Sequence, residues 1–235
     1  PLLKTFDWVP FSEIKEEHFL PAIKELIAET QKEIQDMTDN QNTPSYENTI
    51  EALEYVGEQL GRVTRVFFNL NSAETNDQIQ EIAQEVSPLL SEHQNDILLN
   101  KALFERIKYV YDNKADYKLN EEQEMLLSET YSSFARNGAN LPEDKQKELR
   151  EISAKLSKLS LQFGQNVLAE TNNYSLHLTK EEDLKGLPNA VVEEAKALAE
   201  SRDLEGWVFT LDFPSYVPFM TYADNRELRK EMALA

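Results

Sequence analysis

The chain has 235 residues, the length of one large domain or two small ones. It carries 24 Lys and Arg against 43 Asp and Glu, and its formal net charge of −19 repels nucleic-acid phosphates and anionic lipid headgroups. It has no cysteine, which excludes disulfides and thiolate metal sites. We therefore expect neither nucleic acid nor a membrane among its partners. We expect a cytoplasmic location, with the periplasm as the alternative because a cysteine-free chain suits both compartments.

Helix breakers are rare, with 6 Gly and 9 Pro, and apolar residues recur at helical spacing from the start. The first such segment runs from Phe19 to Ile34. Thr43 and Pro44 fit an N-cap and the first position of a second helix. An apolar stripe then continues from Ile50 to Leu70, which predicts one uninterrupted helix. Gly57 and Gly61, within that stripe, indicate a close approach by a neighbouring element.

Further helices are predicted where a capping residue precedes an apolar stripe. Thr75 with Gln78 fits a capping box for the next helix, which Pro88 should kink. Residues 100–111 form a short helix. Asn120 with Gln123 caps another, which ends in a turn at Gly138.

Pro142 opens the longest helical segment, which runs to Glu170. Its apolar residues keep heptad-like spacing: Leu149, Ile152, Leu156, Leu159, Phe163 and Val167. At a rise of about 1.5 Å per residue this helix is about 43 Å long, so we expect an elongated molecule.

After Thr171 the apolar period changes from helical to alternating, which predicts strands near residues 174–178 and 207–211. A helix from Pro188 to Ser201 separates them. Pro214 and Pro218 are expected to break the chain before a last helical pattern. The predicted fold is mostly α: an elongated multi-helix lobe with a small two-stranded β element.

The domain organisation follows from these elements. We expect a helical lobe over residues 1–170, a small mixed α/β segment over 171–222 and the start of a helix over 223–235. That last pattern is still running at Ala235 without a stop signal, and the chain begins with Pro1 instead of Met. We therefore expect the chain to be a piece of a longer protein.

Catalytic motifs are absent from the sequence. His18, His93 and His177 fall on three different predicted elements, and none belongs to an H-E-x-x-H motif. There is no G-x-S-x-G elbow, P-loop or G-x-G-x-x-G. The histidines are either locally satisfied or converge on a metal, and the spacing favours the first reading. We therefore predict no catalytic and no metal-binding residue in this chain.

Three places carry less ordinary side chains. Phe68 points about 100° away from the buried stripe, so it is either a second core contact or part of a contact surface. Arg136 and Asn137 end a helix, where an arginine complements the helix dipole or clamps a carboxylate. The aromatic segment from Trp207 to Tyr222 either fills a core or forms an interface.

Six segments resemble, in order, the N-terminal region of thimet-oligopeptidase-like zinc metallopeptidases, the bacterial peptidyl-dipeptidase branch above all, with oligopeptidase A as a relative. They are EHFLPAI (17–23), TPSYENTIEAL (43–53), FFNLNSAETN (67–76), FARNGANL (134–141), FGQNVLAETNNYSL (163–176) and FTLDFPSYVPFMTYADNRELRKEM (209–232). Together they extend across nearly the whole chain.

This resemblance implies an N-terminal lobe that forms one wall of a peptide channel. The zinc motif of the family lies in a later catalytic domain, so zinc is expected there and no cofactor in this chain. The implied partners are that catalytic lobe and short peptide substrates, and the candidate channel residues are Phe68, Asn69, Arg136 and Asn137. The alternative is a stand-alone acidic helical interaction module that binds through residues 207–222.

Overall fold

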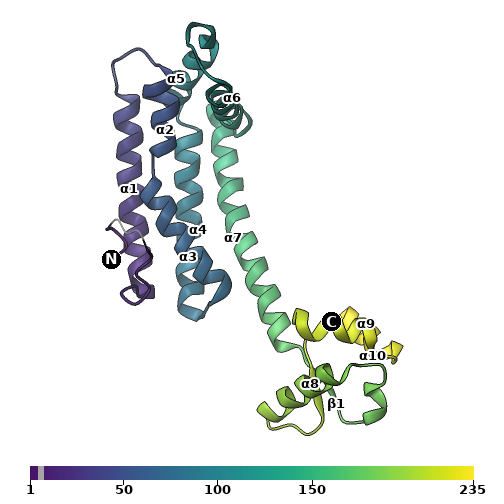
Figure 1. The fold of residues 1–235 in the computed structure, drawn as a ribbon. Coiled ribbons are helices and arrows are strands. Elements are labelled where there is room, and N and C mark those ends of the chain that lie inside the picture. Colours follow the sequence, from purple (N-terminus) through teal and green to yellow (C-terminus); the bar gives the residue numbers. More distant parts are fainter. Residues whose placement is uncertain (5–7) are drawn as a thin grey trace. The chain divides into compact units, whose positions relative to one another are not determined.

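The computed structural model describes residues 1–4 and 8–235. Most of these residues are helical, and two short strands pair, which confirms the predicted fold class (Figure 1). The elements in chain order are η1 (Glu16–His18), α1 (Phe19–Thr38), η2 (Tyr46–Glu51), α2 (Ala52–Tyr55), α3 (Glu58–Ala73), α4 (Asp77–Leu98), α5 (Lys101–Asp112), η3 (Lys114–Asp116), α6 (Glu121–Arg136), α7 (Glu143–Asn173), β1 (Leu176–Leu178), η4 (Glu181–Leu184), α8 (Asn189–Ser201), β2 (Trp207–Phe209), α9 (Phe213–Tyr222) and α10 (Arg226–Leu234).

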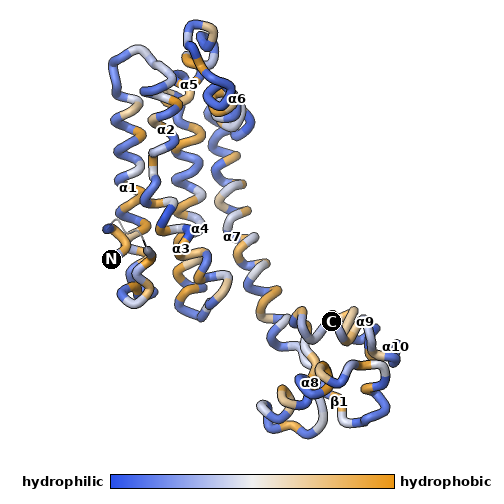
Figure 2. The backbone as a smooth tube through the Cα atoms, in the orientation of Figure 1, coloured by the Kyte–Doolittle hydropathy of each residue, from blue (hydrophilic) through white to orange (hydrophobic). Residues whose placement is uncertain are grey.

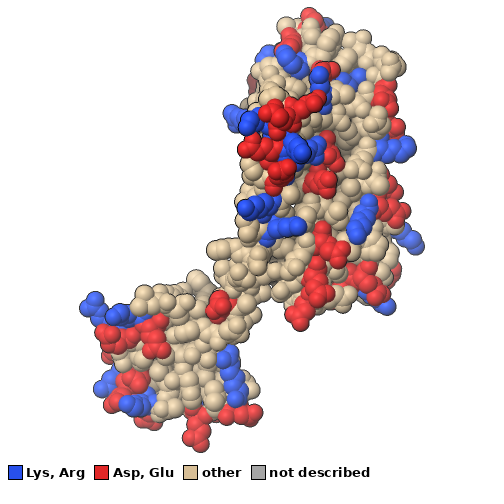
Figure 3. Space-filling view, turned by 180° about the vertical axis from the view of Figure 1, so that it is seen from behind, with Lys and Arg blue, Asp and Glu red and all other residues tan. Residues whose placement is uncertain are grey.

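The chain divides into two compact units, Pro1–Leu161 and Gln162–Ala235. Helix α7 contributes residues to both. Among the described residues, two hydrophobic clusters lie in the first unit and one lies in the second. On the face seen in Figure 3, both units carry acidic and basic side chains, separated by broad areas without charge.

The first cluster lies between α1, α3 and α4, which run side by side (Figure 1). Its centre is aromatic, because the rings of Phe19 and Phe67 lie 5.2 Å apart and both side chains are buried. Hydrophobic residues recur along these helices at the spacing that turns one face inward (Figure 2). The predicted stripe of α3 is therefore a true core face.

The second cluster joins the C-terminal end of α1 to η2, α5 and α6. The Tyr131 ring stacks on Tyr111 at 4.1 Å and on Phe104 at 5.8 Å. Arg106 of α5 is buried beside this cluster. Its guanidinium donates hydrogen bonds to the carbonyl oxygen of Asn40 at 2.9 Å and to Oδ1 of Asn48 at 3.1 Å. Arg106 thus fixes the connection between α1 and η2.

In the second unit, β1 and β2 pair in antiparallel register, with Leu176 opposite Phe209 and Leu178 opposite Trp207. Helix α8 packs on β2, and α9 packs on both α8 and β2. The Phe209 and Phe219 rings lie 4.7 Å apart at the centre of this cluster. The predicted pairing of the two strands is confirmed.

The uninterrupted helix predicted from Ile50 to Leu70 is wrong. Val56 is extended and Gly57 has a φ of +69°, so the segment divides into η2, α2 and α3. Its start is also two residues later than predicted. Ser45 is the N-cap, and its hydroxyl accepts a hydrogen bond from the backbone N–H of Asn48 while Asn48 Oδ1 accepts one from the N–H of Ser45.

Two other local predictions need correction. The N-cap of α4 is Asn76, not Thr75, because Asn76 Oδ1 accepts from the N–H of Ile79 at 2.9 Å. Pro214 and Pro218 do not break the chain, because both lie inside α9. Pro214 occupies the first turn, where no N–H is needed. Pro218 has no N–H, so only the one helical hydrogen bond to the carbonyl oxygen of Pro214 is missing. The capping box of Asn120 and Gln123 is confirmed. Asn100 is the N-cap of α5, a role that the sequence analysis did not assign.

Helix α7 differs from the others because its largest apolar side chains are exposed.

Within the described residues, no helix is long and apolar enough to cross a bilayer.

Candidate functional site

Phe68 and Asn69 lie in the C-terminal half of α3. Phe68 is half-buried, packs on the first cluster and meets the Phe67 ring edge-on at 5.1 Å. It is therefore a second core contact, the structural alternative that the sequence left open. Asn69 is exposed beside it.

Arg136 and Asn137 lie at the C-terminal end of α6, and both are exposed. Asn137 Nδ2 donates a hydrogen bond to the Ser133 carbonyl oxygen at 2.8 Å. Gly138 follows with a φ of +101°, the left-handed turn that the sequence predicted. Figure 1 shows α6 at one end of the first unit and the α3–α4 turn at the other, so the structure does not bring the two pairs of candidates together.

A surface groove of about 430 Å³ lies between α2, α4 and α6, and neither Arg136 nor Asn137 is among its lining residues. Apolar side chains form much of its lining, with carboxylates and small polar groups among them. The residues are Leu53, Glu54, Val56, Gln94, Ile97, Leu98, Leu126, Glu129, Thr130, Ser133 and Phe134.

Two of the candidates follow the α6 side of this groove by helical spacing, beyond its last lining residue on that helix. Leu126, Glu129 and Ser133 follow one another at helical spacing on one face of α6. Three and four residues beyond Ser133, the same row reaches Arg136 and Asn137. An extended peptide in the groove would find apolar surface for a side chain and a guanidinium for a carboxylate at its end. Sequence analysis found Arg136 and Asn137 but missed the groove, because its walls come from three separate elements.

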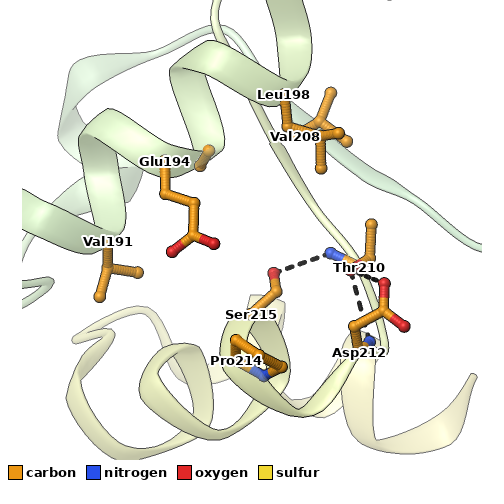
Figure 4. A pocket seen from close by; sticks show the side chains of 9 residues that line it. Val191, Glu194, Leu198, Val208, Thr210, Asp212, Pro214 and Ser215 are labelled. Carbon is orange, nitrogen blue, oxygen red and sulfur yellow. Dashed lines mark hydrogen bonds between the residues drawn. The ribbon is translucent and has the colours of Figure 1, made fainter. Parts of the chain in front are cut away.

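A second cavity of about 270 Å³ lies in the second unit, between α8, β2 and the start of α9 (Figure 4). The Glu194 carboxylate faces it from α8, and Asp212 and Ser215 face it from the other side. Thr210 joins these last two. Its N–H donates to Ser215 Oγ at 2.9 Å, and its hydroxyl donates to Asp212 Oδ2 at 2.9 Å.

Side chains that line this cavity can accept hydrogen bonds, but they do not include a nucleophile paired with a general base. The Ser215 hydroxyl accepts a backbone N–H, and no histidine lines the cavity to act as its base. Its remaining walls are aliphatic: Val191, Ala195, Leu198, Val208 and Pro214. The sequence signal that could have pointed to it is the Asp-Phe-Pro-Ser run at 212–215, which begins α9.

The three histidines have separate surroundings. His18 Nδ1 accepts from the N–H of Lys15 at 3.1 Å, and His177 Nε2 lies 2.6 Å from the carbonyl oxygen of Glu205. His93 is buried in α4, and burial lowers its pKa, with the nearby Asp96 carboxylate acting in the opposite direction. Among the residues that the structure describes, no three His, Cys, Asp or Glu side chains are placed to hold a metal ion.

Comparison with known proteins finds relatives over nearly the whole chain. It is 34% identical over 232 residues to oligopeptidase A of Salmonella typhimurium and 36% identical over 234 residues to oligopeptidase A of Haemophilus influenzae. It is 31% identical over 226 residues to dipeptidyl carboxypeptidase of Salmonella typhimurium. These matches cover 99%, 99% and 96% of this chain. No family model matches it.

The chain spans about a third of the length of these curated relatives, since the matches cover 34%, 34% and 33% of them. The resemblance to thimet-oligopeptidase-like peptidases is thereby confirmed. Both branches named from the sequence are among the relatives, and their identities differ by only a few percentage points.

Proposed function

We propose that this chain is the N-terminal, non-catalytic, substrate-channel lobe of a longer zinc metallopeptidase that hydrolyses short peptides, of the oligopeptidase or peptidyl-dipeptidase type. One observation carries the proposal. The whole chain is similar to relatives named as peptidases, yet it corresponds to a third of their length and contains no H-E-x-x-H motif. The chemistry would then belong to the remainder of the parent polypeptide, which is the first proposed partner of this chain.

The residues that the structure describes do not fit a catalytic zinc ion. The three histidines are engaged separately or buried, and the described residues offer no cluster of three suitable ligands. No step of hydrolysis is therefore assigned to any side chain here. Zinc would be a cofactor of the parent only.

The proposed role of this lobe is to bind and orient the peptide. The groove between α2, α4 and α6 offers apolar surface, and Arg136 and Asn137 extend its α6 wall. Holding a flexible peptide in one orientation lowers the entropic part of the barrier to its cleavage. Asn69, which is exposed, and the solvent-facing part of the half-buried Phe68 are proposed as a separate contact on the same wall, near the other end of the first unit.

Steady-state kinetics of the full-length parent test this role. Arg136→Ala should raise KM for short peptides or shift the preferred peptide length, with kcat nearly unchanged, because the arginine binds substrate without entering the chemistry. Arg202→Ala is the matched control, since Arg202 is also an exposed arginine at a helix C-terminus. If both variants behave as wild type towards peptides of all lengths, the assignment of Arg136 is wrong.

The size of the native protein tests the proposal as a whole. An antibody raised against this chain should detect a band about three times larger than 27.1 kDa in its source cells, in the cytoplasmic fraction. A band at 27.1 kDa would instead favour the stand-alone interaction module. One observation supports that second candidate: Phe213 and Tyr222, at the two ends of α9, are 77% and 52% exposed.

A further inference from the structure

Three leucine and isoleucine side chains on α7 face solvent in the first unit. Ile152, Leu156 and Leu159 are 55%, 61% and 53% exposed, and they follow one another at helical spacing. We call these three residues the α7 stripe. The spacing continues on the same helix, within the second unit, with the exposed Phe163 and Val167. Exposed apolar residues that form a row, in contrast to scattered ones, mark a contact surface.

The opposite face of α7 is the one that packs on the first unit. Arg150 forms a salt bridge with Asp96 of α4 at 2.6 Å, and Leu161 packs against the first cluster. Ser157 lies between them at helical spacing and is half-buried. With 3.6 residues per turn, the α7 stripe lies on the other side of the helix from this row. Helix α7 thus attaches through a side that mixes polar and apolar residues, and it leaves Ile152, Leu156 and Leu159 exposed on the other side.

The charged residues that lie in sequence between those of the α7 stripe are basic, although the chain as a whole is acidic. The protein carries 43 acidic residues, but Lys155 and Lys158 are the only charged residues between Ile152 and Leu161. A surface that fits the stripe would therefore present apolar side chains flanked by carboxylates. A second copy of the chain fits poorly, because each copy has a net charge of −19 and carries the same two lysines at this place.

We propose that the α7 stripe is the docking surface for the part of the parent polypeptide outside this chain, through an apolar segment with flanking Asp or Glu. This inference rests on the proposed function, because it requires the longer parent. The relatives provide the room for such a segment, since about two thirds of their length lies outside the match. A segment of the same polypeptide is held at high effective concentration, so three exposed side chains suffice as part of a larger contact.

Hydrogen–deuterium exchange on the full-length parent and on the 235-residue chain tests the inference directly. Amides of α7 around Leu156 should exchange more slowly in the full-length protein than in the shorter chain. The triple variant I152S/L156S/L159S should remove this extra protection and lower the thermal midpoint of the full-length protein by several degrees. The same variant should leave the midpoint of the 235-residue chain nearly unchanged, because the three side chains are exposed there.

Met125→Ser is the matched control, because Met125 is an exposed apolar residue of α6, 62% accessible, outside the stripe. It should change neither the exchange of α7 nor either midpoint. Equal exchange of α7 in the two proteins would overturn the inference. So would a triple variant that lowers the midpoint of the short chain, or one that abolishes a dimer of the short chain without affecting the full-length protein.

Failure of this inference can be told apart from failure of the proposed function. A full-length parent that cleaves peptides and keeps an unprotected α7 stripe retains the function and refutes the docking surface. If no longer parent exists, both fail together.

Discussion

Gly57 at the start of α3 lies against Thr30 of α1, and a Cβ atom on Gly57 would be only 3.1 Å from Thr30 Cγ2. Thr30 is buried, and its hydroxyl donates a hydrogen bond to the carbonyl oxygen of Leu26 at 2.8 Å. The Gly57 N–H donates to Glu33 Oε2, so α1 also holds the backbone of the turn. A glycine is needed here for two reasons: the left-handed conformation and the close approach of the two helices.

Gly57→Ala should therefore lower the free energy of unfolding by about 1–2 kcal/mol, the usual cost of a left-handed L-residue. Urea denaturation followed by circular dichroism measures this change. Gly61→Ala is the internal control. Gly61 is helical, with only the Arg65 side chain near a built Cβ, so alanine there should stabilise the protein by about 0.5–1 kcal/mol. Destabilisation by both substitutions to the same extent would contradict this account.

This pair also shows how far sequence reasoning reaches. Apolar spacing identified the inward faces of α1 and α3 correctly, because burial depends on a period that the sequence displays. The same spacing runs through Val56 and Gly57, so the break between α2 and α3 was missed. Gly57 indicated the close approach, which Thr30 of α1 makes, but its left-handed conformation and its hydrogen bond to Glu33 were not visible in the sequence.

Arg106→Met should lower the free energy of unfolding by about 1.5–3 kcal/mol, the range for hydrogen bonds made by a charged donor. The substitution keeps most of the side-chain volume but removes the donors to the Asn40 carbonyl and to Asn48 Oδ1. Urea denaturation again provides the measurement.

Arg150→Met serves as the comparison for Arg106→Met. Its ion pair with Asp96 is short at 2.6 Å, but the two side chains are 36% and 40% exposed, so its loss should cost less than about 1 kcal/mol. If Arg150→Met lowered the free energy of unfolding more than Arg106→Met does, burial would not be what makes the hydrogen bonds of Arg106 stabilising.

His93 should make stability depend on pH in the weakly acidic range. Burial lowers its pKa below the usual value in the folded state, so the unfolded chain binds a proton first as the pH falls. The stability that the lowered pKa of His93 contributes is fully present above a pH of about 6.5, and it is lost as the pH falls towards the lowered pKa. Urea midpoints at pH 7.5 and 5.5 should therefore differ less in His93→Gln than in wild type. Equal differences in both proteins would exclude His93 as the cause.

Chelation should distinguish this chain from its proposed parent. Treatment with EDTA should leave the thermal midpoint of the 235-residue chain unchanged, because its residues do not form a metal cluster in the described structure. The same treatment should abolish peptide hydrolysis by the full-length protein, and added zinc should restore it. Stoichiometric zinc in the purified short chain, measured by atomic emission, would revive a site formed by the histidines.

The candidate site was predictable only in part. Arg136 and Asn137 stood out because a cation at a helix C-terminus beside a tight turn is visible in the sequence. The groove next to them was not predictable, since Leu53, Ile97 and Phe134 come from α2, α4 and α6 and meet only in the folded protein. Phe68 shows that two sequence alternatives can hold at one residue: it packs on the first cluster, yet it is only half-buried and stays a candidate surface contact.

The hydrogen bonds of Arg106 have a consequence for the order of folding. They join residues 66 and 58 positions apart in the chain, whereas the caps and turns of the flanking helices are local. Closing so large a loop costs chain entropy that local helix formation does not, so we expect α1 and α5 to form and pack before the connection at residues 39–45 becomes ordered. The hydrogen bonds of the buried guanidinium would then form late in folding. Their loss should raise the unfolding rate of the first unit and hardly change its folding rate.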